Sequence, residues 1–152
     1  MRKIAVVLWC MWAIYPLGAA SVSFLVIETG LPPGIPENPY SVLWENCLLD
    51  VFFESGHIVS NAPLLQLGEK PSDGFPVEAQ KDFGSAKEGG MMYFVVTIVD
   101  HPGNAVSMRL FNTQSQNMIQ EQRYTRQQFR TAREEQDHIK RAIRTMVAQI
   151  RD

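Results

Sequence analysis

The sequence has few of the residues that build disulfides, metal sites and phosphate sites. Only two of its 152 residues are cysteines and three are histidines. His57, His101 and His138 lie far apart, and none has a second ligand at the close spacing that metal sites usually show. Gly89 and Gly90 precede an expected strand, whereas a phosphate-binding loop precedes a helix. We therefore expect no metal and no cofactor.

Net charge is also low, but its distribution is uneven. Residues 21–122 contain four Lys or Arg and twelve Asp or Glu, a net charge of −8, whereas residues 123–152 contain eight and four, a net charge of +4. An acidic body with a basic C-terminal segment indicates self-complementarity or an acidic partner. The simpler interpretation is a solvated helix face. Because the chain as a whole is mildly acidic, nucleic acid is not an expected partner.

The first twenty residues have the anatomy of a cleavable export signal. Arg2 and Lys3 are positively charged, residues 4–15 are uncharged and apolar, and residues 18–20 are the small residues that signal peptidase needs. We expect cleavage after Ala20, give or take a few residues, and a periplasmic or otherwise extracytoplasmic protein without stable membrane insertion. Residues 21–152 then form a single domain.

Two alternatives for this segment stay open. Apolar character resumes at residues 24–27, so the run is almost long enough for an uncleaved anchor, which takes roughly 20 residues. A buried core segment is the other. Lipidation is not expected, because Cys10 lies in the middle of the apolar run behind Trp9. After cleavage Cys47 is the one cysteine left, so an intramolecular disulfide is excluded.

The pattern of apolar residues predicts an α+β domain. Residues 23–28 read as a buried strand, and a helix starts at Asn38 and Pro39, a capping residue and a first-turn proline, and ends at Gly56. A second strand covers 57–67, with a break at Pro63. Residues 68–90 form an irregular loop with at most a short helix near 78–83.

The remaining elements are three strands and a helix. Residues 91–99 are continuously apolar and predict a central strand, and strands at 106–111 and 118–124 follow as an antiparallel meander. The terminal helix starts at a capping box, either Thr131 to Glu134 or Thr125 to Gln128. The order β-α-β-β-β-β-α predicts a mostly antiparallel sheet of about five strands, with two helices on one face and the other face open or covered by a partner.

This order resembles the periplasmic α/β domain shared by the amino-terminal domain of TolB, CsgG and the lipoprotein activators of penicillin-binding proteins. The resemblance is carried by FLVIE, SVLWENCLLDVFFESG, HIVSN, MMYFVVTIVD, VSMRLFNTQSQNMIQEQRY and EEQDHIKRAIRTMVAQI. An Asp-Thr-Gly turn is common in those families, whereas residues 112–116 read Asn-Thr-Gln-Ser-Gln here. The resemblance implies binding of other envelope proteins and no shared catalytic residues.

Carboxylates and a histidine are the weak candidates for chemistry. Glu28 and Asp100 end two expected strands, which could bring them to one sheet edge, and His101 follows Asp100. A hydrolase with paired acids would need the two carboxylates about 5 to 10 Å apart. Asp50 lies on the first helix. Cys47 lies on the apolar face of that helix, which predicts a buried thiol with a raised pKa.

The favoured function is a non-enzymatic extracytoplasmic module that binds an envelope protein or helps to assemble the envelope. Its contact surfaces would be the open sheet face or an exposed strand edge, with Phe111 and Tyr124 as exposed aromatic positions and Arg141 and Arg144 on a basic helix. The alternatives are a small periplasmic hydrolase that uses Glu28, Asp100 and His101, and a subunit of a homo-oligomer.

Overall fold

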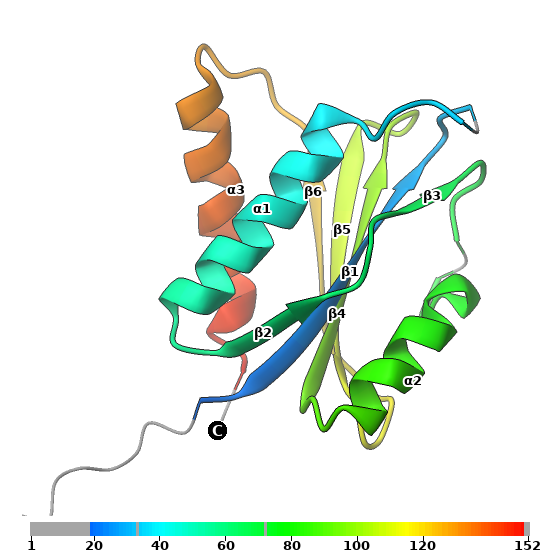
Figure 1. The fold of residues 1–152 in the computed structure, drawn as a ribbon. Coiled ribbons are helices and arrows are strands. Elements are labelled where there is room, and N and C mark those ends of the chain that lie inside the picture. Colours follow the sequence, from blue (N-terminus) through cyan, green and yellow to red (C-terminus); the bar gives the residue numbers. More distant parts are fainter. Residues whose placement is uncertain (1–18, 33, 72, 151–152) are drawn as a thin grey trace, which may run out of the picture.

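One sheet with helices on both faces makes up the domain (Figure 1). The structure is a computed structural model, and it describes residues 19–32, 34–71 and 73–150. In chain order the elements are β1 (Ser21–Thr29), α1 (Pro39–Glu54), β2 (Ile58–Asn61), β3 (Leu65–Leu67), the 3-10 helix η1 (Val77–Ala79), α2 (Gln80–Glu88), β4 (Tyr93–Asp100), β5 (Ala105–Asn112), β6 (Met118–Thr125) and α3 (Ala132–Val147).

The predicted α+β class and the order of the long elements are confirmed, but the sheet is mixed where a mostly antiparallel one was expected. Its strand order is β2-β1-β4-β5-β6, and β3 also pairs with β1. The pairings of β1 with β2, β3 and β4 are parallel, and those of β4 with β5 and β5 with β6 are antiparallel. A helix between two strands returns the chain to the same end of the sheet, so α1 and α2 impose the parallel pairings.

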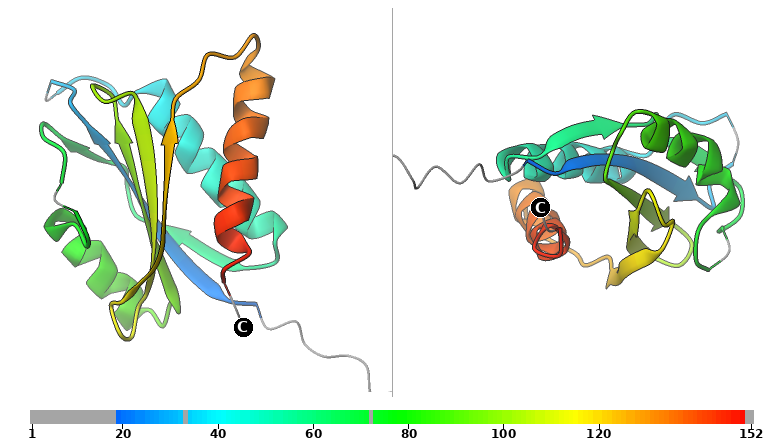
Figure 2. Two further views of the ribbon diagram at one scale, coloured as in Figure 1. Left: turned by 180° about the vertical axis from the view of Figure 1, so that it is seen from behind. Right: turned by 90° about the horizontal axis from the view of Figure 1, so that it is seen from below.

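The two long helices cover one face of the sheet, as predicted, and α2 covers the other (Figure 2). The expectation that this second face is open is therefore wrong. Residues 68–90, expected as an irregular loop with at most a short helix near 78–83, include η1 and the longer helix α2. Phe83 of α2 packs against the sheet and is 3% exposed. The ring of Phe83 lies 5.5 Å from that of Phe94 and 5.0 Å from that of Phe75, both edge to face. These rings form a second apolar core.

Side-chain caps fix where α1 and α3 begin. Asn38 accepts a hydrogen bond from the backbone N–H of Tyr40 at 2.9 Å, ahead of Pro39 in the first turn. Thr131 accepts one from the N–H of Glu134 at 3.2 Å, so the predicted capping box at Thr131 to Glu134 starts α3. Thr125, where the alternative box would begin, is the last residue of β6.

The predicted export signal falls mostly on residues 1–18, which lie outside the described residues, so its cleavage stays a prediction. No helix in the described part of the chain has the length and apolar character needed to cross a bilayer.

Candidate functional site

A buried polar cluster joins the end of β1 to the start of α1. Glu28 is 0% exposed, and its carboxylate accepts hydrogen bonds from the backbone N–H of Asn38 at 3.1 Å and from Nε2 of Gln66 at 2.6 Å. His101 Nε2 lies 3.7 Å from Oε2 of Glu28 and 3.1 Å from the hydroxyl oxygen of Ser41. Glu28 and Asp100 end neighbouring strands, but it is His101, the residue after β4, that meets Glu28 in this cluster.

The geometry of this cluster is that of an anchor. In a serine hydrolase relay the histidine uses one ring nitrogen for the serine and the other for the acid, so that a proton can move between them. Here Ser41 and Glu28 both approach Nε2 of His101, and Ser41 is fully buried. The cluster holds the residues before α1 against the sheet and presents no reachable nucleophile.

Asp100 lies on the opposite side of the sheet from Glu28. The register of β1 and β4 pairs Glu28 with Val99 and Thr29 with Asp100, and successive side chains on a strand point to opposite faces. Asp100 Oδ2 lies 3.3 Å from Nζ of Lys70, and its Oδ1 accepts from the N–H of Gly103 at 3.0 Å. The three hydrolase candidates therefore divide: Glu28 and His101 meet, and Asp100 does not join them.

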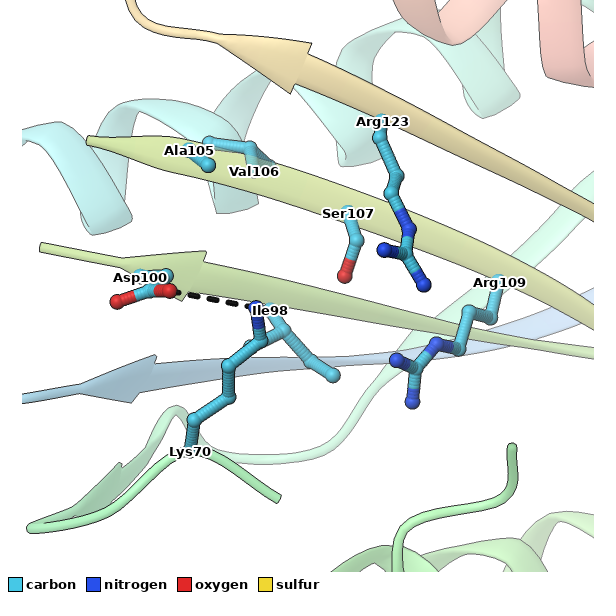
Figure 3. Close-up of a pocket in the computed structure, with 8 residues that line it drawn as sticks. All are labelled: Lys70, Ile98, Asp100, Ala105, Val106, Ser107, Arg109 and Arg123. Carbon is cyan, nitrogen blue, oxygen red and sulfur yellow. Dashed lines mark ion pairs between the residues drawn. The ribbon is translucent and has the colours of Figure 1, made fainter. Parts of the chain in front are cut away.

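On the face that α2 covers, charged side chains line a small pocket over β4, β5 and β6 (Figure 3). The side chain of Arg109 is 1% exposed; its Nε donates to Glu121 at 2.9 Å, and its guanidinium also donates to the carbonyl oxygen of Gly74 at 2.8 Å. Asp73 Oδ1 lies 3.6 Å from Arg109 and 3.5 Å from Arg123. These contacts hold residues 73 and 74 against the sheet.

The pocket is balanced in charge. Burial alone would raise the pKa of Glu121, but the hydrogen bonds and charges of Arg109 and Arg123 outweigh it and hold that pKa below its usual range. Lys70 with Asp100 and the two arginines with Asp73 and Glu121 give three cations and three carboxylates. The one feature of the sequence that points to this pocket is Arg109, an arginine within a largely buried strand.

Neither of the two aromatic residues predicted as exposed contact positions is fully exposed. Phe111 is 1% exposed, and its ring lies 5.0 Å from that of Phe75, so its predicted exposure is wrong because the second face is covered. Tyr124 is half-buried, with its ring 6.1 Å from that of Trp44, and its hydroxyl donates to the carbonyl oxygen of Ala142 at 3.3 Å. Burial raises the pKa of Tyr124.

The basic charge of α3 is partly neutralised by α1. Lys140 Nζ lies 2.9 Å from Asp50, and this hydrogen bond is the main reason that the pKa of Lys140 is raised. Arg144 lies 3.3 Å from Glu54, whereas Arg141 is exposed and has no ion pair among the described residues. Much of the charge complementarity that the sequence suggested is therefore satisfied within one chain.

Cys47 is fully buried in the core under α1. Burial raises the pKa of its thiol to about 11, as the sequence predicted in direction. In a Cys10→Ser chain at pH 8, we expect Cys47 to react with iodoacetamide at least about 100-fold more slowly when folded than in urea, because two units of pKa reduce the thiolate about 100-fold. Mass spectrometry of the alkylated fraction over time measures both rates. Equal rates would show that the thiol is accessible and ionised.

The two edges of the sheet differ. One edge is formed by β2 and β3, which have four and three residues and are separated by a segment that contains Pro63. The other edge is β6, which has eight residues and pairs only with β5 within the described sheet. Met118 and Ile119 on β6 are each 46% exposed, and the side chain of Arg123 is 62% exposed. A long unpaired strand presents backbone N–H and C=O groups to another chain.

The described residues contain no group of three or more His, Cys, Asp or Glu side chains that could hold a metal ion.

The mixed sheet, with two long helices on one face and a short one on the other, defines a small α+β domain. No protein-family model and no curated protein matches the chain.

Among solved structures, this fold is similar to that of PelC from Paraburkholderia phytofirmans, a dodecamer. The TM-score is 0.55 and the identity 13%, and the match covers 88% of this chain and 90% of that chain. The C-terminal domain of LpoB from Escherichia coli matches at a TM-score of 0.47 and 15% identity, over 72% of this chain and 84% of that one. TolB from Acinetobacter baumannii matches at 0.48 and 12%, over 87% of this chain and 29% of that one.

The structural neighbours thus include TolB and the C-terminal domain of LpoB, at low sequence identity. The likeness to PelC shows the fold alone.

Proposed function

We propose that the protein is a non-enzymatic, extracytoplasmic module that binds another cell-envelope protein or helps to assemble the envelope, and that β6 is its contact strand. The observation that carries this proposal is the long unpaired edge of β6, with Met118 and Ile119 exposed at its start. An edge of this kind binds an extended segment of a partner through backbone hydrogen bonds. The export signal predicted at residues 1–20 supports the extracytoplasmic location.

The geometry favours this function over a small hydrolase. Glu28 and Asp100 are on opposite faces of the sheet, so no substrate bond can lie between the two carboxylates. The oxygens of Glu28 already accept from Asn38 and Gln66 and lie beside His101. These polar groups stabilise the fold, and Glu28, which does meet His101, is fully buried.

A second candidate function is that of a subunit in a homo-oligomer. It is favoured by the fold of PelC, whose structure is a dodecamer and matches nearly the whole of both chains. It requires the same kind of surface, because a strand edge can pair with an identical copy as well as with a different protein.

Variants on β6 and at the hydrolase candidates test the proposed function. Ile119→Asp places a charge on the exposed edge, and we expect it to reduce recovery of the bound protein at least about tenfold in a pull-down from cross-linked native cells, since interface anchors of this kind contribute 1–2 kcal/mol or more. Asp100→Ala and His101→Ala are matched variants away from β6 and should leave recovery unchanged.

The opposite pattern would contradict the proposal. If the two alanine variants abolish a measured hydrolase activity while Ile119→Asp changes nothing, the protein is an enzyme. Circular dichroism of all three variants separates loss of binding from loss of folding.

A further inference from the structure

We infer that β6 binds a second copy of this chain, as an antiparallel strand pair about a two-fold axis that passes through Gln122. This inference rests on the proposed function, because it names the occupant of the same edge. The pairing would join two sheets into one continuous sheet across the dimer. It follows from the free edge of β6 and from the positions of its two charged residues, Glu121 and Arg123.

The edge is suited to an antiparallel partner along its length. β6 follows β5 from the pair Ala105–Thr125 to the pair Phe111–Met118, with one irregularity at Leu110 and Phe111. Within the described residues its other side has no strand partner. Side chains along β6 are exposed or only partly buried, and β5 is the one element that packs extensively against this strand within the described residues.

Only a few registers are possible when identical strands pair about a two-fold axis. Residue i of one copy then lies opposite residue 2c − i of the other, where c is the residue on the axis. If the axis passed between two residues, each side chain would lie opposite one that points to the other face of the sheet. The axis must therefore pass through a residue. Both charged residues of β6 lie opposite residues of the partner strand only when c is Glu121, Gln122 or Arg123, because an axis at Gln120 would place Arg123 opposite residue 117, outside the strand.

Charge selects one of these three registers. An axis at Glu121 places two carboxylates opposite each other, and an axis at Arg123 places two guanidinium groups opposite each other. An axis at Gln122 places Glu121 of each copy opposite Arg123 of the other, twice in the dimer. Opposite charges in a cross-strand pair are favourable and like charges unfavourable, each by about 0.2–1 kcal/mol.

The side chains are in position for this pairing. The side chain of Arg123 is 62% exposed and that of Glu121 24%. The two contact each other at 3.2 Å on the face of the sheet that carries the pocket of Figure 3, and on the same face Arg109 donates to Glu121. On the other face Gln122 accepts from the hydroxyl of Tyr124, which leaves its amide N–H groups to donate across the axis. Charged residues on an edge usually discourage strand addition. In this register they favour a single partner.

The opposite edge does not offer an equivalent site. β2 and β3 together replace one strand with two short ones, and the intervening Pro63 has no N–H for a ladder. An interface formed by the same strand on both copies is closed by its two-fold axis. The expected product is therefore a dimer or an assembly built from dimers.

Disulfide formation at the axis tests the occupant and the register. In the full-length chain with Cys10→Ser, Gln122→Cys places two thiols opposite each other, at Cα separations of about 4.5–5.5 Å, within the range of a disulfide. We expect a covalent dimer under mild oxidation at micromolar concentration. Gln120→Cys is the matched control, because its two copies are offset by four residues, about 13 Å, and should remain uncross-linked. Cys47 is buried and does not compete.

A second variant measures the charge pairs. Arg123→Glu converts both Glu–Arg pairs into Glu–Glu pairs, and we expect the dissociation constant of the dimer to rise about 10- to 30-fold in sedimentation equilibrium at low salt, the equivalent of two pairs changing sign. The inference is overturned if Gln122→Cys yields no more dimer than Gln120→Cys, or if the chain is monomeric at every ionic strength.

These failures are distinguishable from failure of the proposed function. Cross-linking of Gln122→Cys to a different envelope protein would reject the second copy and retain β6 as a contact strand. No cross-link from β6 to any protein, in cells or in the purified chain, would reject both.

Discussion

Replacing Arg109 with methionine is expected to lower the free energy of unfolding by about 3 kcal/mol. Removing one charge of a fully buried ion pair costs about 3–5 kcal/mol, because it leaves the other charge buried without a partner. The lower end applies here because Glu121 and Asp73 are partly or largely exposed and both keep a contact with Arg123. The carbonyl oxygen of Gly74 also loses its donor, so we expect residues 73 and 74 to separate from the sheet. Urea denaturation followed by tryptophan fluorescence measures the change.

Arg123→Met is the matched control for this prediction. Its side chain is 62% exposed, and exposed ion pairs contribute about 0–1 kcal/mol, so its effect should be small. Equal losses in the two variants would show that Arg109 does not anchor the segment.

The ion pairs of Glu121 also make the free energy of unfolding depend on pH. The pKa of Glu121 is depressed in the folded chain, so its stabilising contribution is complete above the unfolded value of about 4.3 and is lost as pH falls toward the folded value. In Arg109→Met the free energy of unfolding should fall less as the pH is lowered, because the pKa of Glu121 is then less depressed. A steeper fall with pH in the variant than in the original chain would contradict this.

Replacing Glu28 with alanine is the second change with a large expected effect, again about 3 kcal/mol. A hydrogen bond to a carboxylate contributes about 1.5–3 kcal/mol, and the buried carboxylate of Glu28 accepts one from the backbone N–H of Asn38 and one from the side chain of Gln66. Residues 34–38 and the first turn of α1 should then exchange amide hydrogens faster, because the bond from Asn38 to Glu28 ties them to β1. Urea denaturation and hydrogen exchange read by mass spectrometry report the two effects.

Glu37→Ala, at an exposed position one residue before the cap of α1, is the control and should change stability by less than about 0.5 kcal/mol. If Glu28→Ala matches this control in stability, the buried cluster is not the anchor of α1.

The elements that the sequence predicted well depend on nearby residues. The caps at Asn38 and Thr131 use side chains that bond to backbone groups two or three residues ahead, so a short motif specifies them. The burial of β4 and of Cys47 follows from runs and spacings of apolar residues within a single element.

The elements that it did not predict depend on which distant segments pack together. Alternation along β5 puts Phe111 on the face opposite Leu110, but whether α2 covers that face depends on the fold of residues 68–90. Glu28 and Asp100 do end neighbouring strands, yet the register of β1 and β4, which periodicity does not fix, puts them on opposite faces. The partners of Arg109 come from two segments, around residue 73 and residue 121, for the same reason.

Site-specific photo-cross-linking in native cells tests the central claim most directly, with a photoreactive amino acid at Ile119 on β6 and, as a control, at Glu78, next to α2. After fractionation of the cells, we predict that the protein processed near Ala20 is found outside the cytoplasm and that Ile119, but not Glu78, cross-links to a second copy or to one envelope protein. Cross-links from Glu78 alone, or none from either position, would contradict β6 as the contact strand.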